Sequence, residues 1–501
     1  MTILIRGARV LTLDDENSEY ESADILIEGS KIVAIGPDLT PPGNGAEIEV
    51  IDARGKLVMP GLVNAHFHSS GNFMKGALDD TPLEIFMLYE VPPVTGQVPS
   101  PRHNYVRTVL GAMEMLKRGV TAVQDDAYHV PDVTKDGIDS IMQAYADCGM
   151  RAHVSIDQPN VVEYDKYPYL TDLLPDEIRQ EMKQAPIRSA DDLIALYEWF
   201  IDRWNGACDG RLRCAVSCSA PQRVTTDYLA RLNDLSREHG LAYYIHVLET
   251  KLQRVLGREK YGKSLVRYLH DQGVLNERCN IIHSIWVDDD DIRLLAESGC
   301  TVAHQPLCNM KIGSGVMPFR RLRDHNIPIC LGSDESNTDD SANMWTVAKA
   351  AGLIHKLSDP EYRNWPKAPE ILHCLIGGAA RAMQLTGQVG MLKAGYEADL
   401  ILLDLNTLNF TPLNDLRRQL VYCEDGTSVE MTMVAGNIVY RDGKLLTVNE
   451  EAIKAEVREL MATYGKEIDA ISDSAARLEP YYREMYLRAA AQNVDMNRWV
   501  G

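Results

Sequence analysis

Short apolar runs alternate with longer amphipathic stretches through the middle of the chain. Such runs indicate buried strands, and stretches such as Tyr105–Arg118 and Asp227–His239 indicate helices that cover them. The expected strands, in chain order, are residues 57–66, Thr121–Asp125, Arg151–Ile156, Leu212–Ser217, Ala242–His246, Cys279–His283, Thr301–His304 and Pro328–Asp334. Strands that alternate with helices predict an α/β fold whose parallel sheet closes into a TIM-type (β/α)8 barrel.

Shorter β-like segments at both ends of the chain do not follow this alternation. Thr2–Ile5, Asp24–Glu28 and Lys31–Ile35 lie near the start, and Asp399–Asp404 and Val429–Val434 lie near the other end. Strands this short are not stable alone. We therefore expect the two ends to pair into one small β-sandwich beside the barrel.

The expected organisation has three parts. Residues 1–57 and 392–447 form the β-sandwich, residues 58–391 form the barrel, and residues 448–501 form a C-terminal helical extension. The apolar residues of the extension, such as Trp499, suit either packing on the outside of the barrel or contact with a second subunit.

Histidine and aspartate stand at the ends of four expected strands. The residues concerned are His66 and His68, then His246, His283 and Asp334. Active sites of TIM barrels lie at the C-terminal ends of the strands, and residues two apart on a strand point to the same side. Imidazole nitrogens with a carboxylate suit Zn²⁺ or another divalent ion that keeps one position open for water. We therefore expect a metal centre in the barrel mouth.

Glu249 follows His246 by three residues, where the strand breaks into a loop. A carboxylate there can take a proton from a water whose pKa the metal has lowered, and pass that proton to a leaving group. We expect Glu249 to be this general acid and base. His283 has two possible roles, as a ligand of a second metal or as a group that polarises the substrate and holds the attacking hydroxide.

No lysine ends the fourth expected strand, at Ser217–Ser219, where two-metal barrels commonly bridge their ions through a carboxylated lysine. We therefore expect one metal ion.

Charge and cysteine usage narrow the partners and the compartment. Fifty-one basic and 72 acidic residues give a formal charge of −21, which disfavours nucleic acid and anionic membranes as partners. The sequence has neither a signal-peptide pattern nor a run of about 18 apolar residues. Ten cysteines without a Cys-x-x-Cys pair suit reduced thiols. These features predict a cytoplasmic protein.

Several motifs spread over nearly the whole chain support a family assignment. They are Pro60–His68, Lys75–Leu83, His304–Gly315, Leu331–Asp334, Gly378–Ala382 and Gly395–Leu402. The chain resembles the amidohydrolase superfamily, in the branch of metal-dependent aminohydrolases and chlorohydrolases. That branch holds the S-adenosylhomocysteine/methylthioadenosine deaminases, the guanine and 8-oxoguanine deaminases and the s-triazine hydrolases.

The resemblance implies a ligand set and an oligomeric state. One Zn²⁺, or alternatively Fe²⁺, is held at the positions of His66, His68, His246 and Asp334. The proton shuttle of the family matches Glu249. Its members are often dimers or higher homo-oligomers, which makes a homo-oligomer the expectation here.

The same resemblance places His283 at the substrate-facing histidine of the family. The leading hypothesis is a hydrolytic deaminase that releases ammonia from an aminated N-heterocycle, with His283 and Asp334 orienting the hydroxide and the intermediate. The alternative is a dechlorinase, an alkylamine hydrolase or a cyclic amide hydrolase at the same site. Glu249 favours amine departure, because an amine needs a proton donor and chloride needs none. The complete ligand set argues against a non-enzymatic scaffold.

At two positions this chain departs from the family pattern, and both positions bear on which substrate it binds. Nucleoside-type relatives carry a glutamate where this chain has Ile85, with Glu84 one residue earlier, and a histidine where it has Ser219. A buried ribose hydroxyl left unpaired at Ile85 costs about 1–3 kcal/mol. We therefore expect a small-molecule substrate that is a free base, a pterin or a triazine-like ring, unless Glu84 takes over after a one-residue shift. Asn309 is a further expected contact of the substrate. The tyrosines of the loop Tyr164–Tyr169 have two possible roles, to stack on the flat ring or to pack among themselves at the surface.

Overall fold

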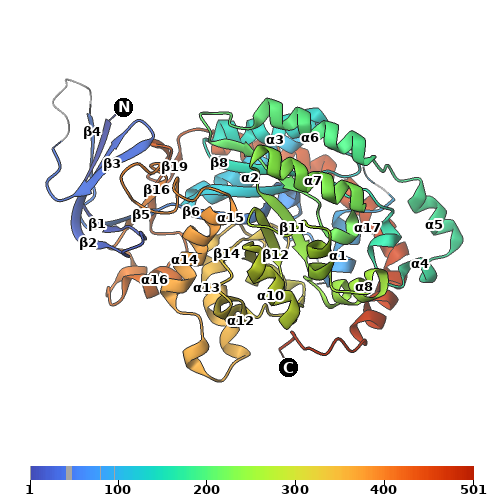
Figure 1. Cartoon of the computed structure of the whole chain (residues 1–501). Helices are drawn as coiled ribbons and strands as arrows, with labels where there is room; N and C mark the ends of the chain where they lie inside the picture. Colours follow the sequence, from blue (N-terminus) through green and yellow to red (C-terminus); the bar gives the residue numbers. More distant parts are fainter. Residues whose placement is uncertain (1, 41–47, 79–80, 95, 97, 501) are drawn as a thin grey trace.

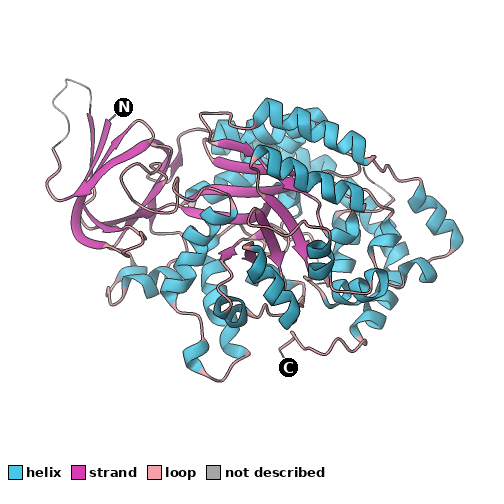
Figure 2. Cartoon of the chain, viewed as in Figure 1, coloured by secondary structure: helices cyan, strands magenta, loops and turns pink. Residues whose placement is uncertain are grey.

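The computed structural model describes residues 2–40, 48–78, 81–94, 96 and 98–500. A β-rich part built from both ends of the chain lies on one side of a larger part in which helices surround a set of strands (Figure 1). Figure 2 shows that the strands of the larger part lie inside and the helices outside. This is the layering that a (β/α)8 barrel requires.

Ten short strands make up the wall of the barrel, in two parallel sheets of five. The first sheet has the order β15-β6-β7-β8-β9 and the second the order β10-β11-β12-β13-β14. Their bounds are β6 (Leu62–His68), β7 (Val120–Tyr128), β8 (Arg151–Asp157), β9 (Leu212–Cys214), β10 (Val216–Ser217), β11 (Tyr243–Val247), β12 (Cys279–His283), β13 (Thr301–His304), β14 (Ile329–Leu331) and β15 (Asp334–Glu335).

The fourth and eighth barrel strands are each interrupted, and the interruptions join the two sheets. Ala215 separates β9 from β10, and its N–H donates to the carbonyl of Val154 on β8 at 2.8 Å. Gly332 lies between β14 and β15, and its N–H donates to the carbonyl of His304 at 3.2 Å. Since the two halves of each interrupted strand pair with different sheets, the ring of eight strands is complete, and the predicted barrel is confirmed.

The outer helices begin at polar caps and bury one face. The caps of α2 (Pro101–Lys117), α3 (Lys135–Cys148), α6 (Ala190–Trp204) and α7 (Thr226–His239) are Ser100, Thr134, Ser189 and Thr225, each accepting from the backbone N–H three residues on. Along α3, Ile138, Ile141 and Tyr145 are buried at helical spacing. None of the helices in the described ranges has both the length and the apolar content of a membrane span.

The remaining helices of the barrel part follow the later strands. They are α8 (Lys251–Tyr261), α9 (Leu265–Asp271), α10 (Asp289–Ser298), α11 (Pro306–Lys311), α12 (Phe319–Asp324), α13 (Met344–Ile354), α14 (Ala368–His373) and α15 (Ala379–Ala382). Between β6 and β7, α1 (Leu83–Glu90) precedes α2, and between β8 and β9, α4 (Leu170–Leu173) and α5 (Asp176–Lys183) precede α6.

Both ends of the chain pair in one nine-stranded sheet that curls around its own apolar core. The ends join where β5 pairs with β16, with Met59 opposite Ile401. Strand β5 therefore carries the end sheet to Pro60, beyond the boundary expected at residue 57. The strands are β1 (Thr2–Leu11), β2 (Glu19–Glu28), β3 (Lys31–Gly36), β4 (Ile48–Asp52), β5 (Lys56–Pro60), β16 (Leu400–Asp404), β17 (Val429–Val434), β18 (Asn437–Arg441) and β19 (Lys444–Leu445).

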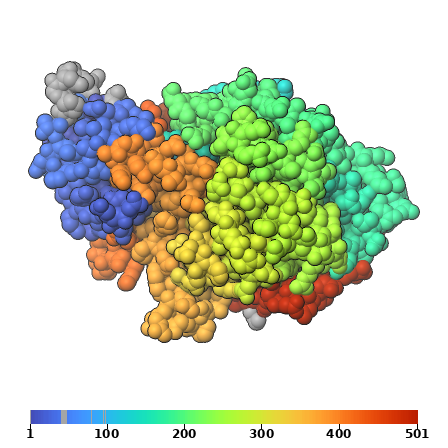
Figure 3. All heavy atoms as spheres, viewed as in Figure 1, coloured from blue at the N-terminus to red at the C-terminus, as the bar shows by residue number. Residues whose placement is uncertain are grey.

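The C-terminal segment lies against its own barrel. Figure 3 shows it in red along the lower edge of the barrel part. Helix α17 (Glu450–Ala490) places the hydroxyl of Tyr482 3.3 Å from the carboxylate of Glu163, and the following tail donates from Arg498 to the carbonyl of Val287 at 2.6 Å. The first of the two expected roles, packing on the outside of the barrel, is therefore observed.

A buried ion pair joins the barrel to the end sheet. The guanidinium of Arg151, at the start of β8, donates to both carboxylate oxygens of Asp399, at 2.8 and 3.0 Å. The side chains are only 4% and 2% exposed, and Asp399 also accepts from the backbone N–H of Ala435 at 2.7 Å. Both charges therefore depend on each other for compensation.

We expect Asp399→Ala to lower the free energy of unfolding by about 3–5 kcal/mol, because it leaves a buried guanidinium without its partner. Urea unfolding followed by circular dichroism measures the change. The matched control is Glu361→Gln, which breaks an exposed pair with Arg363 and should leave the midpoint unchanged. Equal midpoints for wild type and Asp399→Ala would contradict the structural role of this pair.

Candidate active site

The strand ends bring a cluster of nitrogen and oxygen donors together in the barrel mouth. Nε2 of His66 lies 3.4 Å, and Nε2 of His68 lies 3.5 Å, from Oδ1 of Asp334. The ring of His246 lies 4.9 Å from that of His66, measured between centroids. All four side chains are buried. The structure thus brings together the four residues expected to bind a metal ion, from β6, β11 and β15.

One extra residue in β6 relative to β7 changes which side chains of β6 face inward. The pairing shifts between Asn64 and Phe67, so the alternation along the strand is interrupted there. Within this interval, Ala65 packs with alanines of the other barrel strands. The next residue, His66, and also His68 reach the donor cluster, while Phe67 packs in the main apolar core outside the barrel.

Backbone carbonyls orient two of the imidazoles. Nδ1 of His68 lies 2.5 Å from the carbonyl oxygen of Asp126, and Nδ1 of His246 lies 2.7 Å from that of Ser219. When Nδ1–H donates to a carbonyl, Nε2 carries a free lone pair that faces the cluster. His66 has no hydrogen-bond partner on either ring nitrogen among the described residues. These unpartnered nitrogens are what a metal ion would satisfy.

Burial and neighbouring charges act differently on the three imidazoles. Burial lowers the pKa of His66 and, reinforced by the neighbouring His66, lowers the pKa of His246 well below its usual range. Burial alone would also lower the pKa of His68, but the carboxylates of Asp334, Asp126 and Asp157 raise it above its ordinary value. Burial alone would raise the pKa of Asp334, but the surrounding histidines hold it well below the ordinary value. Three imidazoles, in the neutral form that metal binding requires, and one carboxylate fit Zn²⁺ or another divalent ion of similar preference.

Glu249 and His283 lie next to the donor cluster. Oε2 of Glu249 is 3.5 Å from Nε2 of His283, which in turn is 3.7 Å from Oδ2 of Asp334. Burial and the nearby Asp334 raise the pKa of Glu249 well above its usual range, and burial lowers the pKa of His283 to about 3. His283 and Asp334 both have left-handed backbone conformations, with φ of 72° and 65°, a strain typical of functional sites.

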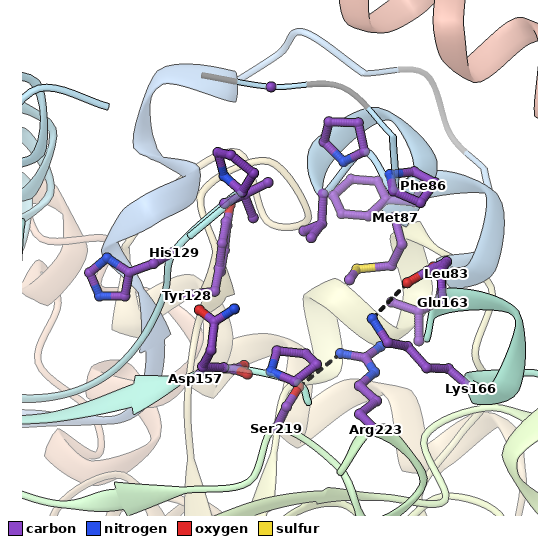
Figure 4. A pocket seen from close by; sticks show the side chains of 18 of the residues that line it. Leu83, Phe86, Met87, Tyr128, His129, Asp157, Glu163, Lys166, Ser219 and Arg223 are labelled. Carbon is purple, nitrogen blue, oxygen red and sulfur yellow. Dashed lines mark hydrogen bonds and ion pairs between the residues drawn. The ribbon is translucent and has the colours of Figure 1, made fainter. Parts of the chain in front are cut away.

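A cavity of about 410 Å³ opens above this cluster. Figure 4 shows its walls: Leu83, Phe86 and Met87 of α1 form an apolar side. Asp157, Ser219 and Arg223 form a polar side opposite them, and Glu163 and Lys166 lie beside Arg223. His68, His246, His283, Glu249 and Asp334 also line the cavity. A substrate bound there reaches both Glu249 and the donor cluster.

Of the four residues expected to contact the substrate, Ser219 lines this cavity. The carboxylate of Glu84 instead accepts from the hydroxyl of Thr250, and Ile85 packs in the main apolar core. Oδ1 of Asn309 lies 3.0 Å from Nδ1 of His283, so Asn309 holds that ring. The argument from Ile85 against a ribose is therefore corrected, because Ile85 is not among the lining residues.

The tyrosines of the loop Tyr164–Tyr169 pack against the protein, which is closer to the second of their two possible roles. Tyr164 is buried, and Tyr167 packs against Tyr482 of α17 with ring centroids 5.5 Å apart. The loop contributes Glu163 and Lys166 to the cavity, and these form an ion pair at 2.6 Å. The loop therefore presents charged side chains to the cavity, while its tyrosines pack against the rest of the protein.

Two buried aspartates at the site did not stand out in the sequence. Asp126 lies two residues before the end of β7 and accepts from the hydroxyls of Ser155 at 2.6 Å and Ser217 at 3.0 Å, while Asp157 ends β8 and lines the cavity. Burial and the neighbouring Asp157 raise the pKa of Asp126 to about 8. The strand-end criterion applies to both, but the expected strands stopped one residue short of each.

Comparisons with known proteins agree with this geometry. Residues 57–439 match the amidohydrolase family. A 5-methylthioadenosine/S-adenosylhomocysteine deaminase of Thermococcus kodakarensis is 32% identical over 441 residues, which cover 88% of this chain and 94% of the relative. A 5'-deoxyadenosine deaminase of Methanosarcina mazei is 29% identical over 456 residues, covering 91% of this chain and 96% of that relative.

Two solved structures share the fold. An atrazine chlorohydrolase of Arthrobacter aurescens, complexed with zinc, superposes with a TM-score of 0.79 at 23% identity and covers 92% of this chain and 100% of its own. An adenosine deaminase of Xanthomonas campestris, with bound zinc, gives a TM-score of 0.81 at 23% identity, with 93% and 98% covered. The chain therefore belongs to the amidohydrolase family, and it is a hydrolase that acts on carbon–nitrogen bonds.

Proposed function

We propose that this protein is a metal-dependent deaminase that releases ammonia from an aminated N-heterocycle by hydrolysis. The observation that carries the proposal is the position of Glu249, which lies between the donor cluster and the open cavity and contacts His283. A buried carboxyl group whose pKa is raised can both accept and return a proton, as amine departure requires. The deaminase names of the two relatives described above support the same chemistry.

In the proposed reaction, the residues at the barrel mouth have different roles. A divalent ion at His66, His68, His246 and Asp334 would lower the pKa of a coordinated water. Glu249 takes one proton from the attacking water and donates it to the exocyclic nitrogen as the carbon–nitrogen bond breaks. The second proton of the water moves to a ring nitrogen, so that ammonia leaves and a ring oxo group remains.

His283 and Asp334 orient the attacking oxygen. Asn309 accepts from Nδ1–H of His283, which leaves Nε2 as a hydrogen-bond acceptor facing Glu249 and Asp334. The imidazole stays neutral because it is buried. Once Glu249 has taken one proton of the water, the remaining O–H donates to Nε2 of His283 or to the carboxylate of Asp334, which holds a lone pair of the oxygen toward the substrate.

We propose further that the ring enters as a free base, a pterin or a triazine-like compound and not as a nucleoside. Helix α1 presents only the apolar side chains Leu83, Phe86 and Met87 to the cavity, and Glu84 is turned to Thr250. A ribose on this side would bury hydroxyls without partners, at a cost of about 1–3 kcal/mol for each. Nucleosides are the direct competitors in any assay, because both relatives are named for adenosine derivatives.

The second candidate is expulsion of chloride or an alkylamine, or opening of a cyclic amide, at the same site. A screen of aminated purines, pyrimidines, pterins and triazines, with their nucleosides, for released ammonia and chloride separates the candidates. Ammonia from free bases supports the proposal. Chloride without ammonia selects the second candidate, and higher kcat/KM for nucleosides overturns the preference for a free ring.

We expect His66→Ala to lose the metal ion, because it removes one of four ligands, and to lose activity with it. Elemental analysis should give about one equivalent of divalent ion for the wild type and far less for the variant. The control is His270→Ala, an exposed histidine whose removal should leave the metal content unchanged. Full metal occupancy in His66→Ala would contradict the proposed ligand set.

Glu249→Gln keeps the size and burial of the side chain but cannot carry the proton. We expect normal metal content with kcat lowered about 10²- to 10⁴-fold. Steady-state ammonia release measures the change, and Glu259→Gln, an exposed position on α8, is the matched control. Turnover near the wild-type rate in Glu249→Gln would show that another group moves the proton.

A further inference from the structure

Arg223 presents a positive charge to the cavity without a carboxylate partner. Its guanidinium lines the cavity, and Nη1 donates to the hydroxyl of Ser219 at 3.0 Å (Figure 4). The ion pairs formed within the described ranges do not include Arg223. By contrast, Lys166, which lines the same wall, is paired with Glu163 at 2.6 Å. The guanidinium of Arg223 therefore has donors left for a ligand.

The position of Arg223 relative to the donor cluster is fixed through Ser219. The carbonyl of Ser219 accepts from His246, and its hydroxyl accepts from Arg223. Ser219 has a left-handed backbone, with φ of 61°, which directs these two groups toward different neighbours. One residue, Ser219, therefore connects the guanidinium of Arg223 to His246, a proposed metal ligand that lines the same cavity.

The surroundings keep this guanidinium in place and charged. Burial alone would lower the pKa of Arg223, but Tyr167 and the carboxylates of Asp157 and Glu249 raise it. The side chain is partly exposed to the cavity, so the N–H donors of its guanidinium that Ser219 does not use are accessible to a ligand oxygen. Planar guanidinium groups recognise planar oxygen acceptors, because two parallel N–H donors match two lone pairs.

We propose that Arg223 binds an oxygen substituent of the substrate, either a ring oxo group or a ring carboxylate. The inference rests on the proposed deaminase function and narrows its substrates to aminated N-heterocycles that also carry such an oxygen. The amino group faces Glu249 and the donor cluster, the oxygen faces Arg223, and the unsubstituted part of the ring lies against Phe86 and Met87 of α1. Arg223 is then a specificity-determining residue.

The test compares three forms of one aminated ring: without oxygen, with a ring oxo group and with a carboxylate. The wild type should have higher kcat/KM for one or both oxygen-bearing forms. Arg223→Gln should lower kcat/KM for those forms about 10- to 100-fold more than for the oxygen-free form, mainly through KM. The form that loses more identifies whether the oxo group or the carboxylate is the ligand. Arg223→Lys should restore only part of the loss, because a lysine lacks the planar fork.

The matched control is Arg213→Gln. Arg213 is a half-buried arginine on β9 that donates to Gln388 at 3.3 Å and is not among the lining residues of the cavity. Thermal unfolding and metal content should be unchanged in both glutamine variants. Equal losses for all three ring forms in Arg223→Gln would show a merely structural role and overturn the proposal.

Calorimetric binding of the deaminated products of the oxo-bearing and the carboxylate-bearing rings separates this inference from the deaminase function. Tighter binding by the metal-loaded wild type than by Arg223→Gln supports the subsite even if no ammonia is released. Equal affinities of the two proteins for both probes overturn the subsite, even if ammonia release confirms the deaminase.

Discussion

Imidazole lone pairs and a carboxylate that are buried together cost free energy unless a proton or a metal cation compensates them. His66, His68, His246 and Asp334 impose this condition on the barrel mouth. The surrounding structure serves to hold them in place: carbonyls fix two of the rings, and the backbone of Gly332 passes so close that a Cβ there would lie 2.8 Å from the carbonyl oxygen of His66. The cavity, the general acid and base and the polar wall are arranged around this cluster.

The barrel and its donor cluster could be predicted from the sequence, because parallel strands end at one edge of a sheet. Apolar runs located each strand to within a few residues, and the polar residue at the end of each run was then necessarily in the mouth. The change in which side chains of β6 face inward could not be predicted. It depends on one unpaired residue between Asn64 and Phe67, and neither the composition nor the hydrophobic periodicity of the sequence indicates that residue.

The substrate side of the cavity shows a second limit of sequence reasoning. On α1, residues three and four apart share a face, so Leu83, Phe86 and Met87 point into the cavity while Glu84 and Ile85 point elsewhere. Successive residues of a helix are rotated by about 100° around its axis. An error of one residue in a predicted helix boundary therefore changes which side chains are expected to reach the ligand. An error of one residue at a strand end has a similar effect, because Asp126 and Asp157 each lie one residue beyond an expected strand.

Helix α17 and the tail after it are synthesised last among the elements that brace the cavity walls. The proposed metal ligands are all present in the chain once Asp334 has been made, whereas Glu163 receives its contact with Tyr482 only after the last helix forms. At about 5–20 residues per second, the interval between these events is roughly ten to thirty seconds. Assembly of the metal centre and completion of the substrate cavity are thus separable in time, and the donor cluster can form before the walls that select the substrate are braced.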